Sequence, residues 1–140
     1  MIQRDYILRM IQEAAEAIAA LMGYRQGGKY DAALRLLGET YEAYFPFSGE
    51  RLRRTEEEDL IQLILEEYSV DEQMLPVLAD LMREEGEYWF AQGDYEKAKA
   101  SLRRALVILN YLNKQDTTLY SFERINKINL IEDRLSDEKM

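Results

Sequence analysis

A glycine followed directly by an aspartate, Gly93-Asp94, constrains the fold of this chain more than any other feature. The residues before it, 81–92, have a helix-compatible composition. After it, apolar residues recur at helical spacing along one face, at positions 95, 98, 102, 105, 106 and 109. Glycine readily adopts the positive φ of a helix end, and aspartate caps the N–H groups of a following helix. The stretch therefore predicts two antiparallel helices joined by a very short turn, with the small residues Gly86 and Ala98 where they approach closely.

The same arrangement occurs a second time, 65 positions upstream. The first helices match less well, because Ala17 and Leu21 stand where Met82 and Gly86 stand in the other copy. Two unrelated helical hairpins can agree this far by coincidence, but we favour a repeated hairpin. Five residues align without gaps, so that Tyr24, Gly28, Tyr30, Ala33 and Leu37 match Trp89, Gly93, Tyr95, Ala98 and Leu102.

These residues resemble the tetratricopeptide repeat, in which a large, a small and an aromatic residue precede the turn and a small and a large residue follow it. Glu85 departs from the pattern, since an apolar residue is usual there, and Asn110 stands near the place of the usual closing proline. The resemblance implies an all-α array of antiparallel helical hairpins with about six helices. The matching residues are Met82, Gly86, Trp89, Gly93, Asp94, Tyr95, Ala98, Leu102 and Ala105.

Three short segments also resemble small uncharacterised bacterial proteins with a tetratricopeptide-like fold. They are RDYILRMI near the start, QGGKY in the first hairpin and QGDYEKA in the second. This resemblance implies a bacterial origin and an architecture, and it implies no catalytic activity.

The chain of 140 residues is expected to form one domain, 1–140, since this length buries a core without disulfides or metal. We place the hairpins at about 2–45 and 73–112, with a connection at 48–54. An intervening helix is expected at 55–68, begun by a capping box of Thr55 and Glu58. A last helix at 117–135, capped by Asp116 or Thr117, is expected to cover the open apolar face of the array. Its apolar stripe comprises Leu119, Phe122, Ile125, Ile128, Ile131 and Leu135.

The composition excludes several classes of site and partner. The chain has no cysteine and no histidine, which excludes disulfides, thiolate nucleophiles, zinc fingers and catalytic triads that use imidazole. Its net charge of −9 argues against nucleic acid and anionic membranes as partners. No apolar run approaches about 18 residues, and Arg4, Asp5 and Arg9 argue against a signal peptide. We expect a cytoplasmic protein.

The many carboxylates indicate no specific catalytic or metal site. They cluster beside expected helix starts and on solvent faces, for example at 56–59, where a capping or solvated role is the common one. A magnesium site built only of carboxylates stays open as an alternative. Gly27-Gly28 lacks the Lys-Ser/Thr pair and the preceding strand of a phosphate-binding loop. We therefore assign no catalytic residue, no metal ligand and no cofactor.

The resemblance to tetratricopeptide repeats implies a groove lined by the first helix of each hairpin. The lysine and asparagine clamp of the chaperone-binding members is missing, so that role is not expected. A groove that is partly acidic and partly apolar suits a peptide or helix with basic and apolar residues, or a helix of this same chain. The candidate groove residues are Ile18, Ala19, Met22 and Arg25 in the first hairpin and Asp80, Arg83, Glu84, Glu87 and Phe90 in the second.

The sequence favours a non-catalytic protein-interaction or self-association scaffold. The mostly alanine stretch from Ala14 to Leu21 either packs inside the molecule or forms the face of a homodimer through the N-terminal helix. A binding module or sensor for a basic and apolar peptide is the alternative. An enzyme that uses carboxylates is the remote third class, and a cleft with two converging carboxylates of strongly shifted pKa would favour it.

Overall fold

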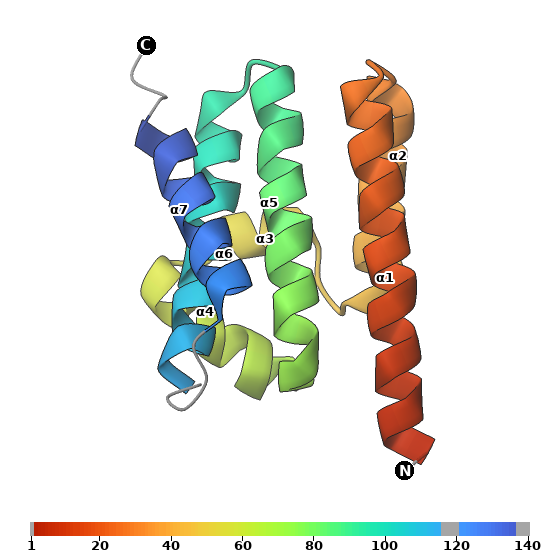
Figure 1. Ribbon diagram of the computed structural model, residues 1–140, viewed down its shortest axis with the longest axis vertical. Coiled ribbons are helices and arrows are strands. Elements are labelled where there is room, and N and C mark those ends of the chain that lie inside the picture. Colours follow the sequence, from red (N-terminus) through yellow and green to blue (C-terminus); the bar gives the residue numbers. More distant parts are fainter. Residues whose placement is uncertain (1, 116–120, 137–140) are drawn as a thin grey trace.

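The computed structural model describes residues 2–115 and 121–136, which form helices joined by short turns, with no strand among them. The predicted all-α fold is confirmed, with seven α-helices in these ranges where about six were expected. None of the described helices is long and apolar enough to cross a membrane. Short 3-10 turns at Glu57–Asp59 and Glu72–Met74 and a π turn at Leu63–Glu67 lie between them. The helices are α1 (Ile2–Gln26), α2 (Tyr30–Tyr44), α3 (Gly49–Arg53), α4 (Leu60–Gln62), α5 (Leu75–Ala91), α6 (Tyr95–Gln115) and α7 (Phe122–Ser136) (Figure 1).

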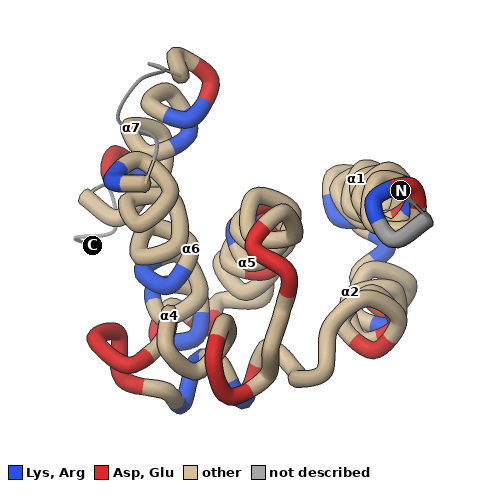
Figure 2. The backbone as a smooth tube through the Cα atoms, turned by 90° about the horizontal axis from the view of Figure 1, so that it is seen from below, with Lys and Arg blue, Asp and Glu red and all other residues tan. Residues whose placement is uncertain are grey.

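Helix α5 lies at the centre of the array. It packs along α6 on one side and against α1 on the other, and α7 packs on α6. Figure 2 looks along the helices and shows α5 between the α1–α2 hairpin and the group of α4, α6 and α7. Leu21 and Leu37 of the first hairpin share one core with Leu78 and Leu102 of the second. Any site between the two hairpins is therefore built on α5.

The two turns predicted at Gly28 and Gly93 have the same backbone conformation. Both glycines have positive φ, 74° and 80° respectively, which residues with a side chain rarely adopt. The alanines five positions later, Ala33 and Ala98, are completely buried. The prediction of two short glycine turns with small buried residues after them is confirmed.

Each turn is also closed by the same hydrogen bond. The N–H of Lys29 donates to the carbonyl of Tyr24 at 2.8 Å, and the N–H of Asp94 donates to the carbonyl of Trp89 at 2.9 Å. The second turn has the predicted cap in addition, since the Asp94 carboxylate accepts from the N–H of Lys97 at 3.2 Å. Lys29 has no side-chain oxygen, so the first turn forms without such a cap.

Helices α5 and α6 approach each other closely at Gly86. A Cβ built at this position would lie 2.7 Å from a methyl carbon of Leu102 and 3.3 Å from the carbonyl oxygen of Ala98. Leu102 is fully buried, so it has little room to move away. Glycine is therefore required here by packing, although it weakens a helix interior by about 1 kcal/mol relative to alanine.

The segment between the hairpins differs from the prediction. Residues 48–54, expected to be a connection, contain α3, which Ser48 caps by accepting from the N–H of Arg51 at 3.1 Å. The expected continuous helix 55–68 is broken into a 3-10 turn, α4 and a π turn. The prediction of a capping box at Thr55 and Glu58 is wrong, because the following turn has no side-chain cap. The Thr55 hydroxyl instead donates back to the carbonyl of Arg51 at 2.8 Å.

Helix α7 begins at Phe122 in the described residues. The Ser121 side chain caps it by accepting from the N–H of Arg124 at 3.1 Å. The expected caps, Asp116 and Thr117, lie outside the described residues, and so does Leu119.

The apolar stripe of α7 is buried only in part. Ile128 and Ile131 are buried in the core and Leu135 packs against it, as predicted. Phe122 was expected on the same stripe, but it is 81% exposed, so this expectation is wrong. The reason is that α7 meets the core further along the helix, at the two isoleucines.

Two glycine-to-alanine substitutions should change stability in opposite directions. Gly86→Ala adds a methyl group against buried Leu102, so it should lower the free energy of unfolding by about 1–3 kcal/mol. Gly38 lies in α2, where an added Cβ would meet no atom within 4 Å, so Gly38→Ala should raise it by up to about 1 kcal/mol. Urea denaturation followed by circular dichroism measures both. Destabilisation of the same size at both positions would contradict the close approach of α5 and α6.

Candidate functional site

A hollow lies between α1, α5 and α7, and we call it the α1–α5–α7 groove. Its volume is ≈ 470 Å³, and its lining includes Asp80, Arg83, Glu84 and Glu87 of α5. Figure 2 shows α5 between α1 and α7. Helix α7 contributes Lys127 at the edge and leaves the space between the helices unfilled. Eight of the nine residues expected on this face line the hollow: Ile18, Ala19, Met22, Arg25, Asp80, Arg83, Glu84 and Glu87.

Phe90 is the one candidate residue that does not line the groove. It lies one turn beyond Glu87 on α5, and the guanidinium of Arg134 lies over its ring at 4.1 Å from the centroid. Its other ring neighbour is Tyr95, at 5.8 Å. Helix α7 therefore covers this end of α5, and Phe90 contributes to packing rather than to the groove surface.

The carboxylates of the groove are all bound by cations of neighbouring helices. The Glu84 carboxylate is buried and accepts two hydrogen bonds from the Arg25 guanidinium of α1. Asp80 accepts from Lys127 of α7 at 2.9 Å. Since Glu84 bonds to the charged guanidinium, it raises the pKa of Arg25. Arg25 therefore stays charged under all ordinary conditions.

Glu87 and Arg83 complete the charge balance of the groove. Glu87 pairs with Arg134 of α7 at 3.1 Å. Arg83 is half-buried and lines the groove, and no hydrogen bond or ion pair to it is found within residues 2–115 and 121–136. The groove thus has its negative charges neutralised by the chain itself and keeps one uncompensated positive charge.

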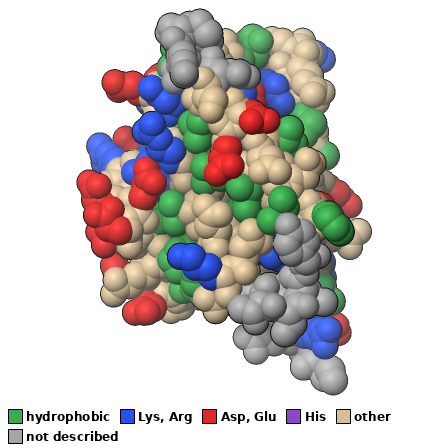
Figure 3. All heavy atoms as spheres, turned by 60° about the vertical axis from the view of Figure 1, so that its left-hand side comes forward, with side chains coloured by type: hydrophobic (Ala, Val, Ile, Leu, Met, Phe, Trp, Pro, Cys, Tyr) green, Lys and Arg blue, Asp and Glu red, His purple; other side chains and the backbone are tan. Residues whose placement is uncertain are grey.

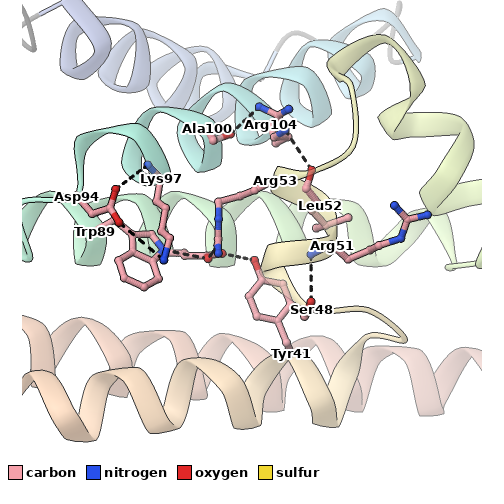
Figure 4. Close-up of polar contacts among 11 residues, drawn as sticks. Tyr41, Ser48, Arg51, Leu52, Arg53, Trp89, Asp94, Lys97, Ala100 and Arg104 are labelled. Carbon is pink, nitrogen blue, oxygen red and sulfur yellow. Dashed lines mark hydrogen bonds and ion pairs between the residues drawn. The ribbon is translucent and has the colours of Figure 1, made fainter.

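A second, larger hollow of ≈ 590 Å³ lies on the other side of α5, between α2 and α3, and we call it the Glu85 pocket. Glu85 is 2% exposed, and its carboxylate accepts hydrogen bonds from three side chains. The Tyr41 hydroxyl of α2 donates to Oε1 at 2.6 Å, while Nε1 of Trp89 and Nη1 of Arg53 donate to Oε2, the former at 3.1 Å. Figure 4 shows Tyr41, Arg53 and Trp89 converging from three helices. The buried charge is therefore paired and fully hydrogen-bonded.

The Glu85 pocket was not predicted as a site. The sequence contained one signal, which is that Glu85 stands where the repeat pattern usually has an apolar residue. Two of its three partners, Tyr41 and Arg53, come from α2 and α3, so the sequence spacing within the second hairpin did not identify them. Burial, together with the negative charge of Glu85, raises the pKa of the Tyr41 hydroxyl well above its ordinary value.

The run of carboxylates at 56–59 is exposed at the surface. Figure 3 shows acidic side chains spread over the face that it views, among basic and hydrophobic ones. Within residues 2–115 and 121–136, no group of three or more acidic side chains is arranged to hold a metal ion.

Comparisons with protein-family models, with curated proteins and with solved structures find no match. What the protein does is therefore inferred from its own geometry.

Removing the charge of Glu85 should destabilise the protein strongly. Glu85→Gln leaves the largely buried Arg53 without its counter-charge, so the free energy of unfolding should fall by about 2–4 kcal/mol. Glu50→Gln is the matched control, since Glu50 and Arg54 form an exposed pair at 3.5 Å, and it should change stability by about 0.5 kcal/mol or less. Urea titration of both variants is the measurement. Similar losses in both would show that the Glu85 network contributes no special stability.

Tyr41 should make stability decline at alkaline pH. Its folded pKa lies above the value of about 10 in the unfolded chain, so its contribution is complete below pH 10 and is lost as pH rises toward the folded pKa. Tyr41→Phe should lower stability at pH 7 by about 1–3 kcal/mol, because a hydrogen bond to a charged group is lost. It should also reduce the decline above pH 10. Tyr111→Phe, which removes a more accessible hydroxyl bonded to Glu72, is the control. An unchanged alkaline decline in Tyr41→Phe would contradict the assignment.

Proposed function

We propose that the protein is a non-catalytic scaffold that binds a segment of a partner protein in the α1–α5–α7 groove. The observation that carries this proposal is the convergence of eight expected residues, from two helices far apart in sequence, on one hollow. The α1 side supplies apolar contact through Ile18, Ala19 and Met22. Grooves between helices commonly bind a helix or peptide through such apolar anchors. The tetratricopeptide-like hairpin arrangement supports the same proposal.

The charges of the groove favour a partner with a carboxylate over a basic partner. The expected preference for basic residues depended on Asp80, Glu84 and Glu87, and each of these pairs with a cation of the chain itself. A basic side chain would have to displace one of those cations to gain a partner. An acidic side chain would instead pair with Arg83, which has no such contact to lose. We therefore propose a segment with an apolar face and an acidic residue.

Selection of displayed random peptides against the wild-type protein tests the proposal. Ala19→Tyr places a bulky neutral side chain in the groove, while Ala20→Tyr places the same side chain on the neighbouring exposed position that does not line it. Selected peptides should bind Ala19→Tyr at least about tenfold more weakly and Ala20→Tyr unchanged, as measured by fluorescence polarisation.

Arg83→Gln tests the charge of the partner separately. Acidic peptides should lose about tenfold in affinity, since a charge-assisted hydrogen bond is removed. If the selected peptides bind the groove but are rich in basic residues, the charge assignment is overturned, while binding in the groove still stands. Failure to select any saturable peptide, or equal binding to both alanine-to-tyrosine variants, would overturn the proposed function.

Self-association through α1 is the second candidate. The alanines at 15, 19 and 20 are exposed, and two large apolar residues near the start of α1, Tyr6 and Leu8, are 55% and 50% exposed. An interface between two copies would bury such side chains.

Sedimentation at high micromolar concentration tests this second candidate. We expect the wild-type protein to be a dimer and the Leu8→Glu variant to be a monomer. Leu130→Glu, which changes a similarly exposed leucine on α7, should leave the dimer intact. A monomeric wild-type protein would remove the candidate.

A further inference from the structure

The Glu85 pocket has the size and lining of a small-molecule site. Its volume of ≈ 590 Å³ falls within the range of roughly 300–1,000 Å³ that is usual for such sites. Its polar floor is fixed, since the Glu85 carboxylate is held by three donors from α2, α3 and α5. The walls are apolar and partly aromatic, formed by Leu34, Leu37, Phe45, Pro46, Phe47 and Trp89.

Gly38 keeps one side of this pocket clear at a cost in stability. It lies in the middle of α2 and lines the pocket, and an added Cβ would meet no atom within 4 Å. Neither a positive φ nor a close approach of another helix requires a glycine there. The equivalent position in the second hairpin is Arg103, so the hairpin geometry does not require one either. With these reasons excluded, the structural effect of Gly38 is the open space that it leaves beside α2.

The charges that line the pocket favour a cation. Glu85 and Arg53 neutralise each other at the floor. Glu42 and Glu50 remain at the rim; Glu42 has no ion pair within the described residues, and Glu50 pairs only with Arg54 in an exposed contact at 3.5 Å. Lys97 lies near Trp89 but is itself paired with Asp94. The net negative rim above apolar walls attracts a positive group and repels a carboxylate.

We propose that the Glu85 pocket binds a small organic cation, namely an amine carried on an aromatic or aliphatic body. The apolar body packs against Leu37, Phe45 and Phe47, in the space that Gly38 leaves open. The ammonium group lies at the rim near Glu42 and Glu50. This site is on the opposite side of α5 from the α1–α5–α7 groove and does not depend on the function proposed for that groove.

The fluorescence of Trp89 provides a direct measurement, because it is the only tryptophan of the chain and it lines the pocket. Three probes of similar size but different charge are titrated: phenethylamine, phenethyl alcohol and phenylacetate. Phenethylamine should give a saturable change with a Kd on the order of millimolar, as expected for a small fragment. The alcohol should bind about three- to tenfold more weakly and the carboxylate more weakly still. High salt should reduce this difference.

Two pairs of variants separate the pocket from non-specific effects. Gly38→Leu fills the pocket and should abolish the saturable change, whereas Glu39→Leu, on the next residue and outside the pocket, should retain it. Circular dichroism checks that both variants are folded. Glu42→Gln should lower the affinity for phenethylamine about two- to fivefold and leave the affinity for phenethyl alcohol unchanged. No saturable response to any probe, an undiminished response in Gly38→Leu, or a preference for phenylacetate would overturn the proposal.

Discussion

Two adjacent glutamates in the middle of α5 connect it by hydrogen bonds to α1, α2 and α3. Successive residues of a helix point roughly 100° apart, so Glu84 faces α1 while Glu85 faces α2 and α3. A buried ion pair stabilises a fold only when hydrogen bonds compensate the loss of water, and here both carboxylates accept two or more. Between them, the two side chains determine how the first hairpin and the α3 segment sit against the second hairpin.

The same two ion pairs shape the hollows on either side of α5. Glu84 and Arg25 lie in the wall of the α1–α5–α7 groove, and Glu85 and Arg53 form the floor of the Glu85 pocket. Each hollow therefore has a rigid polar part whose charges cancel, and the unpaired charges around it set its preference. In the groove this charge is Arg83, and in the pocket it is Glu42, beside Glu50 with its exposed contact to Arg54. The chain, although acidic as a whole, presents surfaces of different charge on the two sides of one helix.

The parts that depend on local spacing could be predicted from the sequence. Gly28 and Gly93 identify the turns because their backbone conformation is rare for other residues. The resemblance to tetratricopeptide repeats implied that Ile18, Met22 and Asp80 line one groove, and they do line one hollow. The parts of the structure that depend on how the helices pack against one another could not be predicted from the sequence. Lys127 and Arg134 reach the groove only because α7 packs on α6 at one angle, which no spacing encodes. Likewise, Thr55 matches a capping pattern, but in the structure its hydroxyl donates to the carbonyl of Arg51 in α3 and caps no following N–H group.

The contact between Gly49 and Glu85 links the α3 segment to α5 in a way that concerns the evolution of the chain. A Cβ at position 49 would lie 2.5 Å from a carboxylate oxygen of Glu85, so a larger residue there would push the carboxylate away from its hydrogen-bond donors. The guanidinium of Arg53 in turn requires that glutamate. Positions 49, 53 and 85 should thus vary together. An apolar residue at 85 would remove the constraint on position 49 and leave Arg53 without its counter-charge, whereas Leu52 would still anchor α3 in the core.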